Sequence, residues 1–378
     1  MKGLVAFVIC AALVAPVAAA AARPTALGQA ERLSGLSARR PIRTVTESSA
    51  RFDADAVRVL DRGYPRSLQR VDDRLYAALG LLPAGGSTRA LMKASVRTID
   101  ALYDPAAHVL RVRRKPAPTR AALVYELVRA LVDQNVGLRR ISTLRARDRD
   151  ASLAANSVVD GLASLASGRR AGPQRGSTID RFLWVERTAG LGPGRTFVAQ
   201  LRSVGGSFAV ATALRTFPQT TEQLLHLDAF LDRARPLPIS LPARVDDRAL
   251  QTSEALTASE TFGELDVRAL LRAFSLPPSD SVAQGWGGGR LALYTGADDA
   301  ATVAVAIRWR SADDFAEWRA AAPALVASAF PAAQERRCPA VDRCWVSGDR
   351  ELALASLGDL TVLASGTAGE LVAASLAR

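Results

Sequence analysis

The spacing of apolar residues predicts a mainly helical first half. Residues 53–82 carry apolar side chains at helical intervals, with an interruption at Gly63-Tyr64-Pro65. Residues 96–112 predict a hairpin, because Asp104-Pro105 favours a turn between two β-prone runs. Thr119 is a suitable N-cap for the helix that follows. Helices are predicted over residues 119–135, 147–167, 196–215 with a break at Gly205-Gly206, and 221–233.

Beyond Trp286 the pattern changes to short strands. We predict strands over residues 290–294, 302–309, 343–347, 351–356 and 360–364, and a helix over 312–330. Two T-x-x-E capping boxes, Thr261 to Glu264 and Thr367 to Glu370, predict helix starts. The expected fold class is therefore α+β: a mainly helical region over 51–240 with a β-hairpin, then an antiparallel sheet over 241–378 with helices on one face.

The first 22 residues have the features of a cleavable secretory signal. One basic residue precedes an apolar run over residues 4–17, and alanines in an A-x-A arrangement follow. Residues 23–50 lack sustained periodicity and are predicted to be a flexible leader. No second long apolar run follows, so we expect no transmembrane segment after cleavage. The protein is expected to be secreted or held in the cell envelope.

The net charge limits the binding partners that we expect. The formal net charge is +12 and comes almost entirely from arginine, but the arginines are interspersed with acidic residues. Together with export, this leads us to expect no nucleic-acid partner, and leaves an anionic envelope ligand open.

The cysteines predict a disulfide bond. Cys10 lies in the signal, whereas Cys338 and Cys344 remain as a close pair. Such a pair in an exported chain predicts a disulfide.

The stretch Leu-Val-Tyr-Glu-Leu-Val-Arg-Ala-Leu-Val-Asp-Gln-Asn over residues 123–135 is the basis of a family resemblance. It resembles the HE-x-x-HALQDQ helix of a bacterial family of zincin-like metallopeptidases, in which two histidines one turn apart bind zinc and the glutamate polarises the metal-bound water. Further segments resemble family landmarks in the same order: residues 78–83, 102–105, 150–154, 160–163, 220–226, 262–265 and 285–288. The resemblance thus covers roughly residues 55 to 320.

The zinc ligands of that family are replaced in this chain. Tyr125 and Arg129 stand at the two histidine positions, Asp160 stands at the third ligand position, and Glu126 is retained. Arginine carries a fixed positive charge and has no lone pair to donate to a metal. A catalytic zinc site needs three protein ligands, and the chain has two histidines, His108 and His226. We therefore expect no metal and no cofactor.

The resemblance implies that Glu126, Arg129 and Asp160 form an ionic cluster in the volume of the lost metal, with Tyr125 beside it. A simpler alternative is a solvated ion pair between Glu126 and Arg129, which are three residues apart on one helix. The function expected from the resemblance is that of a pseudoenzyme that binds a peptide, protein or anionic envelope ligand in the old cleft without catalysis.

Two alternative functions remain open. Gly205-Gly206-Ser207-Phe208-Ala209 is one residue from G-x-S-x-G, and His226 follows it, so the candidate groups of a hydrolase are Ser207 with His226, or Glu126. The helical pattern before Ser207 instead favours a glycine break between packed helices. The third alternative is a structural cell-envelope protein without a cleft around Glu126.

Overall fold

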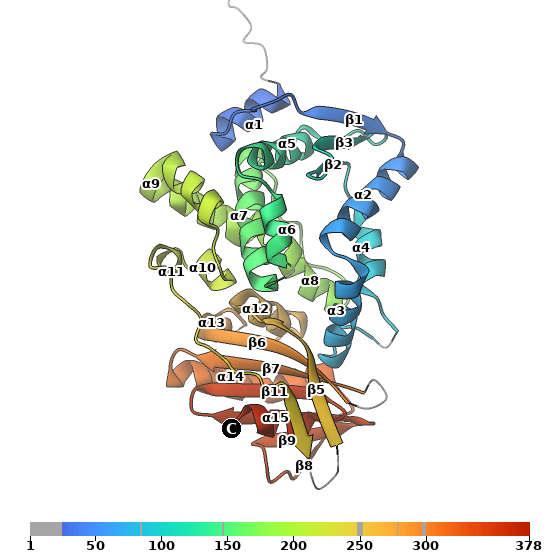
Figure 1. The fold of residues 1–378 in the computed structure, drawn as a ribbon, viewed down its shortest axis with the longest axis vertical. Coiled ribbons are helices and arrows are strands. Elements are labelled where there is room, and N and C mark those ends of the chain that lie inside the picture. The colour runs from blue at the N-terminus through green and yellow to red at the C-terminus, as the bar shows by residue number, and fades with distance from the viewer. Residues whose placement is uncertain (1–24, 84, 146, 248–251, 278, 297–299) are drawn as a thin grey trace, which may run out of the picture.

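The computed structural model describes residues 25–378 except 84, 146, 248–251, 278 and 297–299. The predicted signal over residues 1–22 lies outside the described residues. A helical region forms one end of the molecule and an eight-stranded sheet with its own helices forms the other, as Figure 1 shows. The α+β class predicted from the hydrophobic pattern is confirmed.

The helical region is assembled around α7 (Arg149–Ser167), which packs against α5, α6, α9 and the π-helical turn η1. The other elements of this region are α2 (Ser49–Gly63), α3 (Arg66–Ala78), α4 (Thr88–Val96), α5 (Arg120–Asn135), α6 (Arg139–Arg145), α8 (Thr178–Thr188), η1 (Gly190–Gly194), α9 (Arg195–Thr216), α10 (Thr221–Leu225) and α11 (Leu227–Leu231). The predicted break inside α9 is present, because Gly205 and Gly206 leave helical geometry. The helix expected over 221–233 is instead two short helices separated by His226.

The segment expected to be a flexible leader is ordered secondary structure from residue 25 onward. Helix α1 (Ala26–Ser34) is capped by the Thr25 hydroxyl, which accepts from the Gly28 backbone N–H at 3.0 Å, and it packs on α5 and α7. Strand β1 (Arg43–Glu47) pairs in parallel with β3 (Val109–Arg113), which also pairs with β2 (Ala101–Asp104) in the predicted hairpin. The leader prediction was wrong because both elements depend on partners distant in sequence.

The large sheet has the strand order β4-β5-β6-β7-β11-β10-β9-β8 and is antiparallel throughout. Its strands are β4 (Arg244–Asp247), β5 (Thr252–Thr261), β6 (Trp286–Thr295), β7 (Ala301–Trp309), β8 (Gln334–Arg336), β9 (Arg343–Ser347), β10 (Arg350–Leu357) and β11 (Leu360–Gly366). The five predicted strands correspond to β6, β7, β9, β10 and β11. The first two strands and β8 were not predicted.

Helices cover both faces of this sheet, not one as the sequence suggested. Leu291 and Leu293 face the core that contains α12 (Glu264–Ala273), α13 (Ser279–Gln284) and α14 (Ala312–Ala329). Ala292 and Tyr294 alternate with these leucines along β6, so they face the opposite core, which lies under α15 (Gly369–Leu376). Alternation along each strand allows both faces to be buried, and a sheet with two apolar faces needs a cover on each.

Neither predicted T-x-x-E box caps its helix. The Asp266 carboxylate accepts from the Gly263 N–H at 2.9 Å at the start of α12, whereas the Thr261 hydroxyl donates to Asp148 at 2.7 Å. Helix α15 begins after Ala368 without a side-chain cap. The local motif fails at Thr261 because a partner on another element takes its hydroxyl.

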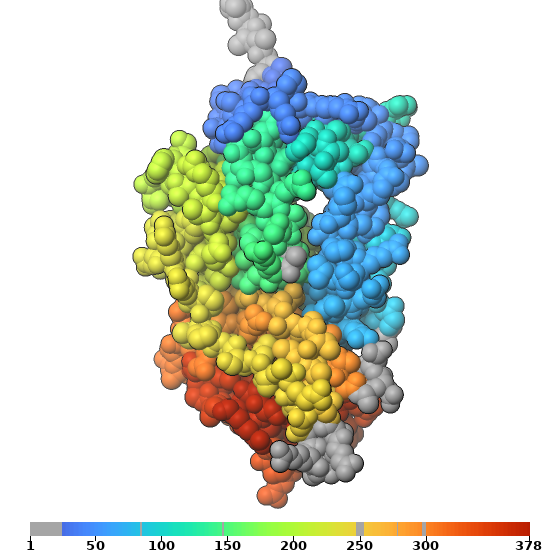
Figure 2. All heavy atoms as spheres, viewed as in Figure 1, coloured from blue at the N-terminus to red at the C-terminus, as the bar shows by residue number. Residues whose placement is uncertain are grey.

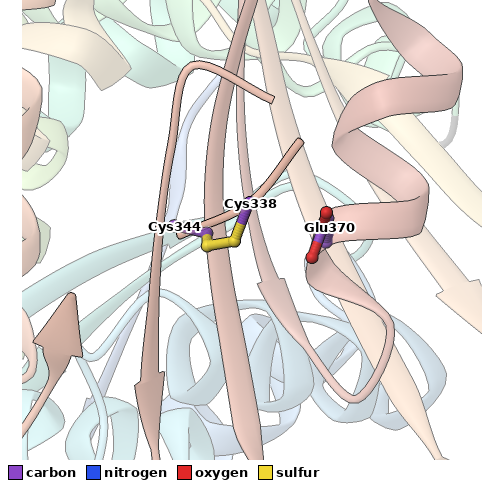
Figure 3. A group of neighbouring side chains, drawn as sticks. All are labelled: Cys338, Cys344 and Glu370. Atoms are coloured by element: carbon purple, nitrogen blue, oxygen red, sulfur yellow. A yellow bond between two sulfur atoms is a disulfide. The ribbon is translucent and has the colours of Figure 1, made fainter. Parts of the chain in front are cut away.

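Cys338 and Cys344 form the predicted disulfide, and Figure 3 shows Glu370 near it. The two cysteines and Glu370 have the grouping of a metal site. Disulfide sulfurs are not thiolates, however, and the Glu370 carboxylate accepts from Arg336 Nη2 at 3.1 Å. The disulfide is therefore structural, and Glu370 beside it belongs to an ion pair.

The helical stretch Thr178–Thr216, made of α8, η1 and α9, is long and apolar enough to cross a membrane by length and composition alone. Phe197 and Leu201 within it are buried in the helical core. The backbone also leaves helical geometry at Gly205 and Gly206. We therefore describe this stretch as part of the packed helical region.

The contact between α7 and η1 requires glycine. A Cβ added at Gly161 would lie 2.3 Å from the Gly194 carbonyl carbon and oxygen, which are backbone atoms and cannot rotate away. A Cβ at Gly192, in the same η1 turn, would meet nothing within 4 Å.

We predict that Gly161→Ala lowers the free energy of unfolding by roughly 2 kcal/mol, because overpacking outweighs the gain in helix propensity. Gly192→Ala is the matched control and should change it by less than about 0.5 kcal/mol. Urea denaturation measures both. Equal stability of the two variants would contradict this account of the α7–η1 contact.

Candidate functional site

Helix α5 carries three of the four residues of the expected ionic cluster, Tyr125, Glu126 and Arg129. Thr119 caps it as predicted, since the Thr119 hydroxyl accepts from the Ala122 N–H at 3.1 Å. One side of α5 packs against the β2–β3 hairpin and another against α7. This position directs Glu126 toward the hairpin, where its Oε2 accepts from the Tyr103 backbone N–H at 2.8 Å.

Arg129 lies between the two carboxylates. Its Nη1 forms an ion pair and hydrogen bond with Asp160 Oδ1 on α7, and its Nε lies 3.7 Å from Glu126 Oε2. The structure thus brings Glu126, Arg129 and Asp160 together, as the cluster hypothesis requires. The alternative of a solvated pair does not describe it, because the Glu126 side chain is only 8% exposed and Arg129 contacts a second helix.

Tyr125 occupies the inner side of this cluster. Its residue is 9% exposed, and the guanidinium carbon of Arg169 lies 4.8 Å from the centroid of its ring. Burial, and then the nearby negative charge of Asp160, raise the pKa of Tyr125 well above its usual range. The phenol is therefore neutral at physiological pH, and it packs under a cation instead of serving as an anionic ligand.

The charges of the cluster are interdependent. Burial raises the pKa of Glu126, while the positive charge of Arg129 opposes that shift. Burial disfavours the charged form of Arg129, but the carboxylates of Asp160 and Glu126 outweigh it and raise the pKa of the guanidinium. The arginine is thus the counterion shared by two carboxylates in a mostly buried site.

These residues do not fit a zinc ion. A zinc ligand must offer a lone pair, and the position between Glu126 and Asp160 is taken by a guanidinium that offers none. The backbone also closes in on Asp160, because a Cβ added at Gly190 of η1 would lie 2.2 Å from the Asp160 Cβ. The arrangement can compensate charge and hold two helices together, but it does not supply a Lewis acid.

A second polar cluster ties the hairpin tip to the end of α5, and the sequence reasoning did not identify it. The Tyr103 hydroxyl donates to Asp133 Oδ2 at 2.7 Å, and His108 Nδ1 lies 3.0 Å from the same oxygen. Asp133 Oδ1 accepts from the Leu138 N–H at 2.8 Å. Asp133 is four residues after Arg129, so helical spacing was the signal that could have placed it on the same side of α5.

The two hydrolase candidates are not brought together. Ser207 is exposed beside the Gly205-Gly206 kink of α9. His226 lies between α10 and α11, where its Nε2 is 2.9 Å from Glu264 Oε2. Among the contacts of residues 25–378 that the structure describes, there is none between Ser207 and His226. The nucleophile–base contact that a serine hydrolase needs is not formed by this pair.

A cavity of about 340 Å³ lies between α2–α4 and α6–α8. Figure 2 shows the molecule hollowed between the blue segment, which contains α2–α4, and the green segment, which contains α5–α7. Ser152 and Asn156 of α7 line the cavity, and Asp160 follows Asn156 by one helical turn. The cavity and the Arg129–Asp160 pair therefore lie along one row of α7.

No sequence motif indicated this cavity, because its walls come from helices far apart in the chain. Leu60, Met92 and Leu153 supply apolar lining. Two of the three arginines in the lining form ion pairs: Arg145 with Asp72 and Glu260, each at 3.2 Å, and Arg149 with Asp266 at 2.7 Å and with Glu186. The third is Arg187 of α8.

Comparison with known proteins bears on the sheet and not on this site. A family model described as a domain of unknown function (DUF8575) matches residues 251–374. That match covers the large sheet from β5 to β11 and most of α15. It begins well after α5 and α7 in the sequence. No curated protein and no solved structure matches the chain.

We predict that Arg129→Met lowers the free energy of unfolding by roughly 2 kcal/mol at pH 8, because it leaves Glu126 and Asp160 uncompensated. The folded-state pKa of Glu126 is already raised and rises further without the arginine. The loss should therefore shrink as the pH falls toward about 4.3, where the unfolded carboxyl also takes up its proton. Urea denaturation across this pH range measures it.

The double variant Glu126→Gln/Arg129→Met serves as the control. It removes one uncompensated charge, so it should be more stable than Arg129→Met at pH 8 and should show less dependence on pH. An Arg129→Met penalty that is the same at pH 5 and pH 8 would count against electrostatic coupling in the cluster.

Proposed function

We propose that the chain is an exported, metallopeptidase-like pseudoenzyme that has no zinc site and binds a peptide, protein or anionic envelope ligand. The observation that carries the proposal is the position of Arg129, whose guanidinium lies between Glu126 and Asp160. In the family that the α5 segment resembles, these positions surround the metal. Their convergence here, from two helices and with a cation at the centre, is the arrangement expected of a site that has exchanged metal for arginine.

Glu126 is not available as a general base in this arrangement. Its Oε2 accepts a backbone hydrogen bond from Tyr103 and lies within ion-pair distance of Arg129. A general base must reach the proton of an attacking water, and it acts best with a pKa near the working pH. The contacts of Glu126 serve the packing of α5 on the hairpin, which supports a binding role over hydrolysis.

The cavity beside the cluster is the proposed place of binding. Its volume of about 340 Å³ and its apolar lining at Leu60, Met92 and Leu153 suit an apolar side chain of a peptide or protein. Arg145 and Arg149 in its lining are already paired with acidic residues, and Arg187 is the third arginine of the lining. The hydrolase alternative has no comparable support, since Ser207 and His226 lie apart.

We predict that the chain from Arg23 onward, purified without chelator or histidine tag, contains no stoichiometric zinc, even after incubation with zinc salts. Elemental analysis after gel filtration measures this. If about one zinc per chain were bound, and lost in Glu126→Ala or Asp160→Ala, the chain would have a metal site with unusual ligands and the proposal would be wrong.

A graft tests whether the geometry is that of a metal site. We predict that Tyr125→His/Arg129→His/Asp160→Glu binds about one zinc ion per chain, because two imidazoles one turn apart then converge with a carboxylate. The control is Ala324→His/Ser328→His, which places two histidines at the same spacing on exposed positions of α14, where residues 318–333 contain no aspartate or glutamate. Isothermal titration calorimetry should show clearly tighter zinc binding by the graft; equal affinities would remove the support for a vestigial site.

A further inference from the structure

Helix α9 exposes large apolar side chains at its central kink. Phe208 is 75% exposed and Val204 is 62% exposed, on either side of Gly205-Gly206. Leu33, at the end of α1, is 38% exposed, and its carbonyl oxygen accepts from Arg202 Nη2 of α9 at 2.6 Å. Gly206 has φ 60° and ψ −150°, a conformation open in practice to glycine alone. The kink is thus a built feature that presents apolar residues to the outside.

A groove of about 460 Å³ lies immediately before the kink along α9. Arg195, Thr196, Gln200 and Ser203 line it from α9, Leu191 lines it from η1, and Arg170 lines it from the segment after α7. Arg195 Nη1 donates to the Ser164 carbonyl at 2.8 Å. Among the described contacts, neither Arg170 nor Arg195 has a carboxylate partner. The groove therefore offers two guanidinium groups and polar side chains to an anion.

The charge around these arginines is one-sided. Burial, and then the like charge of Arg170, lower the pKa of Arg195. The sequence from residue 187 to 221 contains four arginines and no aspartate or glutamate. The arginines of the buried clusters, Arg129 and Arg149, are paired with carboxylates, whereas those of this groove have no carboxylate partner among the described contacts and are open to an external anion.

The stretch that contains α9 is also apolar, and although Phe197 and Leu201 are buried in the helical core, Val204 and Phe208 are not covered. Its most apolar window, within Thr178–Thr216, meets the composition of a membrane-crossing helix, yet only 33% of that window is buried. A core helix of a soluble protein hides such a surface. An apolar, basic and exposed helical surface is the pattern of a segment that lies in a membrane interface.

We propose that Leu33, Val204 and Phe208, together with the Arg170–Arg195 groove, form a docking face for an anionic lipid membrane surface. The apolar residues enter the boundary between headgroups and acyl chains, while the groove receives lipid phosphates. A membrane fits this surface better than a protein partner does. In a membrane, phosphate groups lie directly outside an apolar layer, and along α9 the basic groove likewise lies next to the apolar kink. This inference is independent of the proposed function.

Vesicle co-sedimentation tests the proposal, with the chain from Arg23 onward so that the apolar run over residues 4–17 does not contribute. Binding should be stronger to vesicles of equal parts phosphatidylcholine and phosphatidylglycerol than to phosphatidylcholine alone, and should fall as salt is added. Arg170→Gln/Arg195→Gln should weaken it roughly 30-fold, since each arginine near a membrane surface contributes about a fivefold change.

The matched control is Arg244→Gln/Arg337→Gln, which removes the same charge from exposed positions in the sheet region, where neither arginine has a carboxylate partner among the described contacts. It should change binding by less than about threefold.

Val204→Ser/Phe208→Ser removes the apolar contacts with the membrane, so it should lose the part of the binding that persists at high salt. A Phe208→Cys variant labelled with an environment-sensitive dye should show a blue shift on the anionic vesicles, and because Phe208 is exposed this readout does not depend on the arginine variants folding.

Three results would overturn the proposal: equal binding to both kinds of vesicle, equal losses in the groove and control variants, or no spectral shift at residue 208. A lipid-free chain that dimerises, and becomes monomeric in Val204→Ser/Phe208→Ser, would likewise overturn it and assign the face to a second copy of the chain. Light scattering during gel filtration measures this last outcome.

Discussion

The buried ion pair between Arg149 and Asp266 is the interaction on which the arrangement of the two regions depends. Arg149 begins α7 and Asp266 lies in the first turn of α12, and their charged groups are 2.7 Å apart with Asp266 fully buried. Loss of either partner would strand a charge at a cost of about 3–5 kcal/mol. Because this contact fixes the start of α7 against the sheet region, it also sets where the later turns of α7 place Asn156 and Asp160.

The same chemistry recurs at Arg129. In both places a guanidinium with several donors satisfies carboxylates that come from different elements, which an ammonium could do less well. This helps to explain why the positive charge of the chain is almost entirely arginine. At Arg129 the compensation has a chemical consequence as well, because a fixed cation occupies the position between Glu126 and Asp160. The two helices therefore converge on an ionic cluster that offers no Lewis acid.

Glycine at the α7–η1 contact connects the site with the α9 face. Gly161, Gly190 and Gly194 allow the η1 backbone to approach α7 at Ser157 and Asp160, so α9 leaves this turn in a fixed direction. The two sides of α7 then differ in character. One row borders an apolar cavity in whose lining Arg145 and Arg149 are paired with carboxylates, and the other supports a groove whose arginines have no carboxylate partner among the described contacts.

The sequence by itself determined those features that depend on local spacing: the helices α2, α3, α5, α7 and α9, the hairpin at Asp104-Pro105, the kink at Gly205-Gly206 and the α+β class. The approach of Arg129 to Asp160 could be anticipated only through the family resemblance, because the two residues are on different helices. Tertiary structure alone decided that β1 pairs with β3, that Thr261 serves Asp148 instead of a helix cap, and that helices from residue 60 to residue 187 enclose one cavity. The physical reason is that each of these outcomes depends on a partner far away in the chain, whose distance no local pattern of apolar and polar residues records.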